Sequence, residues 1–187
     1  MDARKSFEKL LPNERVEELM AIGRREGIQK GQYYIRAGET PNKFAYVLKG
    51  IFRYVYLSEQ GKAFTKGIIL EDRFISSYSA MISNKPSYFF IEALEDAELF
   101  SIPYVKWRQL LKSDPFWPSF LLGFVERGFG IKEKRERDML LLDAQSRYRE
   151  FLEEYPNMEK RIPQTVIASY LGIQPESLSR IRKKQAP

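Results

Sequence analysis

Residues 164–183 read QTVIASYLGIQPESLSRIRK, which is the pattern of two short helices joined by a tight turn. Gly172 lies where the turn requires a left-handed backbone, which costs glycine little. Ala168 is small enough to let the second helix approach the first. Pro175 suits the first turn of the second helix, because its missing N–H would be unpaired there anyway. The apolar contacts that fix the angle between the two helices are expected from Ile167, Leu171, Ile173, Leu178 and Ile181. The stretch predicts a helix-turn-helix; an ordinary helical hairpin with an exposed polar face is the alternative.

The second helix would present polar side chains outward. Arginine can bind guanine O6 and N7 with two hydrogen bonds, glutamate can accept one from cytosine N4, and serine can reach a base or a phosphate. Basic residues behind them suit phosphates, which position a protein without reading sequence. We therefore predict a DNA-binding surface made by Thr165, Gln174, Glu176, Ser177, Ser179, Arg180, Arg182, Lys183 and Lys184.

The distribution of charge also indicates a polyanionic partner. The formal net charge of the chain is +6. Residues 160–187 contain six basic residues and one acidic residue, Glu176, so most of the excess lies in the last segment. A basic segment is typical of nucleic-acid binding, although a solvated basic tail would have the same composition.

The composition excludes several classes of protein. The chain has 187 residues, of which 43% are hydrophobic, enough for one large domain or two small ones with a buried core. It has neither cysteine nor histidine, which excludes disulfides, thiolate zinc sites, cysteine-ligated iron–sulfur clusters, histidine-ligated haem, and catalysis by Ser-His-Asp or Cys-His. No Asp-rich loop has the spacing of a magnesium or calcium site, so we expect neither a metal nor a cofactor. Apolar runs are too short for a membrane span and no apolar signal segment follows Met1, so we expect a cytoplasmic protein.

Residues 1–115 predict a β-rich domain preceded by helical material. Residues 6–27 have apolar side chains at roughly helical spacing. From about Ile28, short β-branched and aromatic runs alternate with turn signals such as Lys49-Gly50 and Ser58–Gly61. Many short strands at this spacing predict a β-barrel or jelly roll, and no run is long enough to suggest a parallel α/β sheet.

Helical spacing returns after Pro103. A short helix over Tyr104–Leu111 precedes chain breaks at Asp114-Pro115 and Pro118, and a long helix follows from about Ser119 to Asp143. About 25 residues of helix are too long to be packed inside a domain this small. We therefore expect residues 116–143 to bridge domains or to pair with their counterpart in a dimer, with a single helix lying on the barrel as the alternative. Residues 144–187 would form the DNA-binding domain, and the fold class is α+β.

A β-rich domain followed by a long helix and a helix-turn-helix resembles the cAMP-receptor-protein/FNR (Crp/Fnr) family of bacterial regulators, from about Gly31 to Lys184. The resembling stretches are Gly31, Gly38-Glu39, Tyr46–Gly50, Gly61-Lys62, Ile91–Asp96, Ile167–Ile173 and Pro175–Ile181. The resemblance implies an N-terminal jelly-roll β-barrel of the cyclic-nucleotide-binding type, a dimerisation helix and a C-terminal helix-turn-helix. It also implies that Glu176, Ser177 and Arg180 contact DNA, and that a homodimer binds a near-palindromic operator with half-sites about one helical turn apart.

Two features depart from the family pattern. Members that bind cyclic nucleotides carry a cassette resembling F-G-E…R-S/T-A, whose Glu holds the ribose 2′-hydroxyl and whose Arg pairs with the phosphate. Here Ser76-Ser77 stand near the Gly-Glu positions and Ser87-Tyr88 near the Arg-Ser positions, so both charged residues are missing. A buried phosphate without the guanidinium would be costly, and Lys85 could offer only a point charge. We therefore expect no binding of cAMP. Few residues follow Lys184, so we also expect no C-terminal wing.

The barrel is rich in aromatic residues, which allow two interpretations. They would fill the barrel interior as core, or they would line a pocket for an apolar or aromatic effector. The candidate pocket residues are Tyr54, Phe74, Ser76, Tyr78, Lys85, Ser87 and Tyr88.

The sequence therefore predicts a dimeric, sequence-specific DNA-binding transcriptional regulator of the Crp/Fnr type, which is not an enzyme. Its expected partners are double-stranded DNA, a second copy of the chain and a small-molecule effector of unknown identity. The alternative is a ligand-binding regulatory module that senses a small molecule or nucleotide and does not itself bind DNA, against which the basic helix-turn-helix argues. An enzyme on a cupin-like barrel is a third class, but such enzymes usually need a histidine-ligated metal.

Overall fold

The computed structural model describes residues 2–185, and side chains as far as Lys184. The outer limits of the predicted domains, Met1 and Pro187, lie outside the described residues. The chain divides into two compact units, of which the first comprises Met1–Lys62 and Lys66–Trp117 and the second comprises Ala63–Thr65 and Pro118–Pro187.

The first unit begins with two short helices and an edge strand, α1 (Ala3–Glu8), α2 (Asn13–Ile22) and β1 (Arg24–Ile28). The prediction of helical material up to residue 27 is wrong at its end, because residues 24–28 pair with β8 (Ala97–Pro103) in antiparallel register. Charged residues are common on edge strands, and the run Arg24-Arg25-Glu26 lacks the apolar alternation by which a strand is recognised. The main-chain bonds to β8 define this strand.

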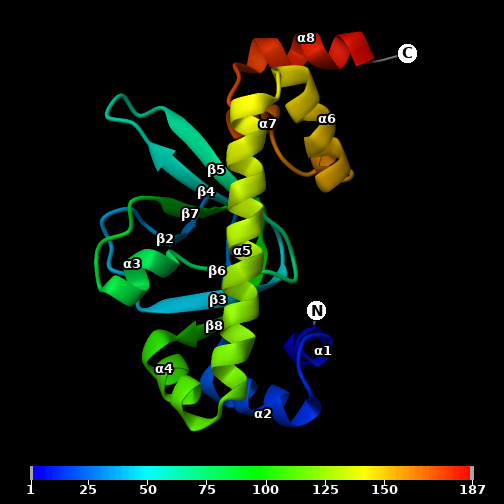
Figure 1. Ribbon diagram of the computed structural model, residues 1–187. Helices are drawn as coiled ribbons and strands as arrows, with labels where there is room; N and C mark the ends of the chain where they lie inside the picture. Colours follow the sequence, from blue (N-terminus) through cyan, green and yellow to red (C-terminus); the bar gives the residue numbers. More distant parts are fainter. Residues whose placement is uncertain (1, 186–187) are drawn as a thin grey trace. The chain divides into compact units, whose positions relative to one another are not determined.

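Eight strands of the described chain form two four-stranded sheets, with the orders β1-β8-β3-β6 and β2-β7-β4-β5 (Figure 1). The remaining bounds are β2 (Tyr33–Ile35), β3 (Lys43–Lys49), β4 (Phe52–Leu57), β5 (Ala63–Ile69), β6 (Phe74–Ile75) and β7 (Phe90–Ala93). The non-sequential strand order across two antiparallel sheets confirms the predicted jelly roll.

Apolar side chains from both sheets form the core of the barrel. The cluster includes Val47, Ile75, Ile91 and Leu99, all without exposed surface. Tyr34, Phe52 and Phe89 belong to the same cluster, which confirms the interpretation of these aromatic residues as core. Other aromatic residues lie on the opposite face of their strands, where Phe7 of α1 packs on Tyr46 and Trp107 packs on Phe44.

Two helices follow the last strand, α4 (Tyr104–Ser113) and the long α5 (Phe116–Leu141). The long helix is confirmed, but the predicted break at Pro118 is wrong. Pro118 is the third residue of α5, where the helix needs no N–H donor from it. Asp114 caps this end by accepting a hydrogen bond from the Phe116 N–H at 2.8 Å, and the buried Trp117 donates from Nε1 to Glu18 at 2.8 Å.

The second unit contains the helices that follow α5, namely α6 (Ala144–Glu154), the 3-10 helix η1 (Met158–Lys160), α7 (Gln164–Leu171) and α8 (Pro175–Gln185). The predicted helix-turn-helix is confirmed as α7 and α8 (Figure 1). Asp143 begins α6 by accepting from the Ser146 N–H. Three rings, Phe151, Tyr155 and Tyr170, pack against one another with centroids 5.3–5.8 Å apart. Among helices of residues 2–185, none is long and apolar enough to cross a membrane.

Candidate nucleic-acid interface and candidate effector site

The turn between α7 and α8 is closed by main-chain hydrogen bonds. Gly172 has φ 69°, the left-handed conformation that the sequence predicts. The Ile173 N–H donates to the Ala168 carbonyl at 3.0 Å, which closes the C-terminus of α7. Ala168 is fully buried, as expected of the position at which the sequence predicts a close approach of the two helices. These main-chain bonds constrain the direction in which α8 leaves the turn.

The burial pattern of α8 sets which side chains it presents to solvent. Leu178 is fully buried and Ile181 is half-buried, so these two side chains define the inner face. At about 100° per residue, the positions opposite Leu178 are those of Glu176, Arg180 and Lys183, and all three are exposed. The outer face of α8 thus combines an acid and two bases in one row.

Most of the predicted DNA-binding residues have exposed side chains. The exposed ones are Thr165, Gln174, Glu176, Ser179, Arg180, Lys183 and Lys184, whereas Ser177 and Arg182 are half-buried. Thr165 lies in the first turn of α7 and Gln174 directly before α8, while the others lie on α8. Arg182 differs from the rest because its Nε lies 3.1 Å from Glu159 Oε1.

Two arginines that sequence analysis did not single out stabilise the helix-turn-helix from outside. Arg147 of α6 donates from Nε to the Leu171 carbonyl at 3.0 Å, and Arg135 of α5 donates to the Tyr170 carbonyl at 2.6 Å. Cations that bond the last carbonyls of a helix are favourable there. The Arg135 guanidinium also lies 3.8 Å from the centre of the Tyr170 ring. Arg135 stands in a mixed-charge run of α5, which explains why its role is not visible in the sequence.

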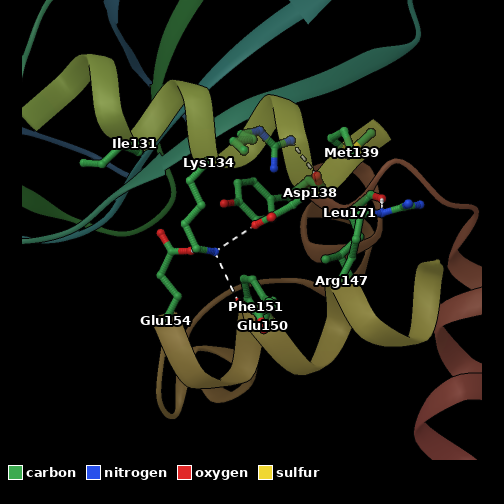
Figure 2. Close-up of a pocket in the computed structure, with 11 residues that line it drawn as sticks. Ile131, Lys134, Asp138, Met139, Arg147, Glu150, Phe151, Glu154 and Leu171 are labelled. Atoms are coloured by element: carbon green, nitrogen blue, oxygen red, sulfur yellow. Dashed lines mark hydrogen bonds and ion pairs between the residues drawn. The ribbon is translucent and has the colours of Figure 1, made fainter. Parts of the chain in front are cut away.

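A small cavity lies among α5, α6 and α7 (Figure 2). Its volume is about 30 Å³, which leaves room for about two water molecules. Lys134, Arg135 and Asp138 of α5 and Glu150 of α6 are among the side chains around it. A cavity of this size does not suit an organic effector.

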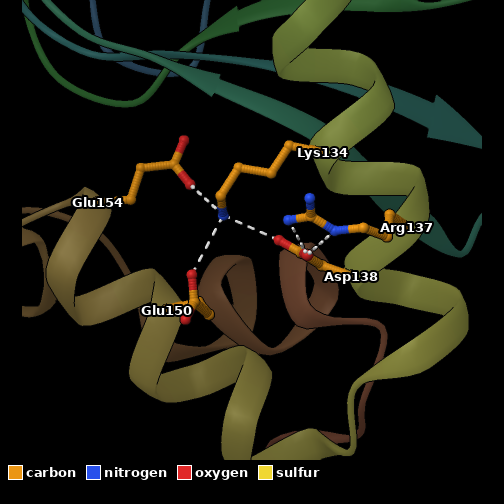
Figure 3. A network of polar contacts seen from close by, with 5 residues as sticks. All are labelled: Lys134, Arg137, Asp138, Glu150 and Glu154. Atoms are coloured by element: carbon orange, nitrogen blue, oxygen red, sulfur yellow. Dashed lines mark hydrogen bonds and ion pairs between the residues drawn. The ribbon is translucent and has the colours of Figure 1, made fainter.

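The charged groups at this cavity pair with one another (Figure 3). Lys134 Nζ lies 2.8 Å from Asp138, 3.3 Å from Glu150 and 3.7 Å from Glu154, and Arg137 lies 2.9 Å from Asp138. The hydrogen bond from Lys134 lowers the pKa of Asp138, and the same bond raises the pKa of Lys134. We call these five residues the α5–α6 charge network; it fixes α6 against α5.

In the barrel, the region of the predicted effector pocket is built around two serines. Ser77 and Ser87 are buried, and their Oγ atoms lie 2.9 Å apart. Ser87 Oγ also donates to the Phe89 carbonyl at 2.7 Å. The two hydroxyls at the cassette positions therefore satisfy each other.

The structure brings only some of the other predicted pocket residues close to these serines. Tyr54 belongs here, because its hydroxyl accepts from the Ser76 N–H at 3.4 Å, and burial raises its pKa to about 12. Tyr78, Lys85 and Tyr88 are exposed, Tyr88 by 83%. The structure does not bring Phe74 to this region. Strand side chains alternate between faces, and since Ile75 faces the core, Phe74 packs on the other side against Phe44 and Tyr46, at 5.8 and 4.9 Å.

Lys66 is a charged residue of the barrel that sequence analysis missed. Its Nζ lies 4.1 Å from the ring centre of Phe89, 5.7 Å from that of Tyr56 and 5.8 Å from that of Tyr54. An ammonium within about 6 Å of a ring face is attracted to it. No local spacing in the sequence indicates this role, because the three rings belong to residues elsewhere in the chain.

These features define a class of protein, a jelly-roll domain joined through a long helix to a helix-turn-helix. Residues 25–114 match the family model of the cyclic nucleotide-binding domain.

Solved structures share the fold over most of the chain. They include the c-di-GMP responsive global regulator CLP of Xanthomonas campestris, with 16% identity, a TM-score of 0.76, and coverage of 92% of this chain and 91% of that one. FixK2 of Bradyrhizobium japonicum has 17% identity and a TM-score of 0.76, with coverage of 87% and 84%.

A protein of Eubacterium rectale described as a transcriptional regulator of the Crp/Fnr family has 17% identity and a TM-score of 0.74, with coverage of 98% and 87%. No curated protein sequence matches the chain. Residues 25–114 therefore match the model of the cyclic nucleotide-binding domain, and the chain shares its fold with solved structures of Crp/Fnr regulators. This confirms the resemblance found in the sequence.

Proposed function

We propose that the protein is a dimeric, sequence-specific DNA-binding transcriptional regulator that works in the cytoplasm. The observation that carries the proposal is the outer face of α8. Glu176, Arg180 and Lys183 lie in one exposed row opposite the buried Leu178. A helix of this kind fits the major groove, where side chains near its N-terminus reach base edges.

Each side chain of the interface has a role that its chemistry suits. Arg180 reads a guanine through O6 and N7, Glu176 accepts from a cytosine N4–H, and Ser177 and Ser179 reach bases or phosphates. Lys183 and Lys184 bind phosphates. Thr165 and Gln174, at or next to the N-termini of α7 and α8, bind the DNA backbone as well, since helix N-termini attract anions.

An apolar row on α5 supports the dimer. Leu122, Val125 and Phe129 are exposed by 56%, 44% and 67%. Their spacing of three and four residues is that of the seam of a two-helix coiled coil. A two-fold dimer would bind a near-palindromic operator, because the symmetry of the site mirrors that of the protein.

The proposal includes a barrel that does not take cAMP. The cassette positions hold the hydrogen-bonded pair Ser77 and Ser87 in place of an acid and an arginine, and an unpaired phosphate charge would be costly to bury. Calorimetric titration with cAMP and cGMP should give no heat of binding at micromolar ligand. Micromolar affinity for either nucleotide would contradict this part of the proposal.

Selection of bound DNA from a random pool tests the central claim. We expect one enriched, two-fold symmetric site, and Arg180→Ala should weaken binding to it by about 1–3 kcal/mol and relax one base position per half-site. Arg149→Ala, which changes an exposed arginine of α6, serves as the control and should leave affinity unchanged. A pool without enrichment would favour a ligand-binding module that does not touch DNA.

A further inference from the structure

Arg182 does not lie on the outer face of α8. It follows Leu178 by four residues, so the two side chains lie on the same side of the helix. Leu178 is fully buried, and the Arg182 side chain is correspondingly only 34% exposed. Arg180 and Lys183 point away from the body of the domain, whereas Arg182 points back towards it.

The partner of Arg182 is a carboxylate that is itself fixed. Arg182 Nε lies 3.1 Å from Glu159 Oε1, and the Tyr148 hydroxyl donates to the same oxygen. Tyr148 is buried. Burial and the nearby Glu159 carboxylate raise the pKa of Tyr148 to about 12, so it stays a hydrogen-bond donor at neutral pH. Glu159 thus accepts a hydrogen bond from Tyr148 of α6 and forms an ion pair with Arg182 of α8.

Glu159 stands on a short segment with little freedom to move. It belongs to η1, whose first residue Met158 is buried and whose preceding residue Asn157 has a left-handed backbone with φ 63°. The Met158 N–H donates to the Tyr155 carbonyl, and the Met158 carbonyl accepts from the Ile162 N–H. Main-chain bonds therefore tie this segment to the end of α6 and to the approach to α7.

The ion pair adds a directional constraint to α8. Apolar contacts such as those of Leu178 and Ile181 are non-directional, so they allow a helix to tilt and roll. Arg182 lies about 6 Å along the axis from Leu178. A charge-assisted bond at that distance fixes the rotation of the helix, and base contacts require side chains placed to within about 0.5 Å.

We propose that Tyr148, Glu159 and Arg182 form a positioning triad that sets the orientation of the recognition helix, and that Arg182 acts through Glu159 and not as a phosphate contact. The inference rests on the proposed function. It assigns the specificity of DNA binding partly to residues that touch no DNA.

Salt dependence separates positioning from phosphate contact. The salt slope is the absolute value of the slope of log K against log salt, and each lost phosphate contact lowers it by about 0.9. We expect Arg182→Gln to leave this slope unchanged and to lower the ratio of operator to random-sequence affinity by roughly tenfold, as a lost base contact would. Its neighbour on the outer face gives the matched control, because Lys183→Gln should lower the slope by about 0.9 and leave the ratio unchanged.

A charge exchange gives a second, independent test. Glu159→Arg and Arg182→Glu should each lower the ratio, and the double variant should restore at least part of it because the pair is re-formed with opposite polarity. Tyr148→Phe keeps the buried ring and removes only the hydroxyl, so it should lower the ratio by a smaller factor, roughly threefold. Circular dichroism of each variant establishes that it is folded.

The possible results separate the two claims. If Arg182→Gln lowers the salt slope as Lys183→Gln does, or if the double variant binds all DNA more weakly than either single one, Arg182 contacts phosphate and the triad is wrong. If the unaltered protein binds no DNA at any salt concentration, the proposed function fails first.

Discussion

Gly50 and Gly61 both have a backbone with positive φ, but their surroundings differ. Their φ angles are 102° and 75°, a region that costs other residues about 1 kcal/mol or more. A Cβ on Gly50 would lie 2.5 Å from Ala97 Cβ and 2.9 Å from Ala97 Cα, whereas none of the neighbouring atoms lies within 4 Å of one on Gly61. Gly50→Ala should therefore lower the free energy of unfolding by about 2–4 kcal/mol and Gly61→Ala by about 1. Urea unfolding of both variants measures the difference, and equal losses would show that β8 yields to the added methyl group.

Residues whose role follows from local geometry are the ones that the sequence predicts. Gly172, Pro175 and Leu178 act within one turn of their own helix, so their spacing identifies them. Arg182 and Lys66 have roles set by residues far away in the chain, Glu159 and Phe89. No local pattern contains those partners, so the sequence predicts a phosphate contact for Arg182 and no role for Lys66.

At the scale of elements, the α5–α6 charge network makes the stability of the second unit depend on pH. Lys134→Met would leave Asp138, Glu150 and Glu154 close together without their shared cation. We expect a loss of about 1 kcal/mol in the free energy of unfolding at neutral pH, because the groups are partly exposed and solvent screens them. Lys132→Met, at an exposed position of the same helix, should change stability little.

The sign of the pH dependence follows from the two pKa shifts. The folded pKa of Asp138 lies below its usual value of 3.8, so its contribution is present above that value and is lost as pH falls through the folded pKa. The folded pKa of Lys134 lies above 10.5, so its contribution is present below 10.5 and is lost as pH rises further. The difference between Lys134→Met and the unaltered protein should be largest between these limits and disappear in acid. A difference that is constant with pH in urea unfolding would exclude an electrostatic cause.

Helices whose apolar residues recur at regular spacing can be predicted from the sequence. Strands that are defined by hydrogen bonds to a distant strand cannot. The apolar spacing of α7 and α8 and the length of α5 are visible in the sequence. Strand β1 is not, since Arg24, Arg25 and Glu26 are on an edge strand that pairs with β8, far away in the chain. For a similar reason, the sequence predicts only some of the residues around the buried serines. Which face of the sheet Phe74 lies on depends on how β6 pairs with β3.

At the scale of the whole molecule, the proposed activity depends on a second copy of the chain. One α8 reads a few base pairs, and a dimer doubles the number of base contacts made at once. Phe129 is the most exposed of the apolar row Leu122, Val125 and Phe129. In the dimer, a carboxylate at position 129 would be buried against the same carboxylate of the second chain, with no cation to pair with. Burying an unpaired charge in this way is costly.

Phe129→Glu should therefore make the protein monomeric at micromolar concentration in sedimentation equilibrium and weaken operator binding by roughly a hundredfold or more. The matched control is Val105→Glu, which places the same charge on an exposed apolar residue of α4 and should alter neither measurement. Phe129→Leu keeps an apolar seam and should remain dimeric. If Phe129→Glu stays dimeric with unchanged operator affinity, the two copies do not meet along this row of α5, and the half-sites must be held together by another surface.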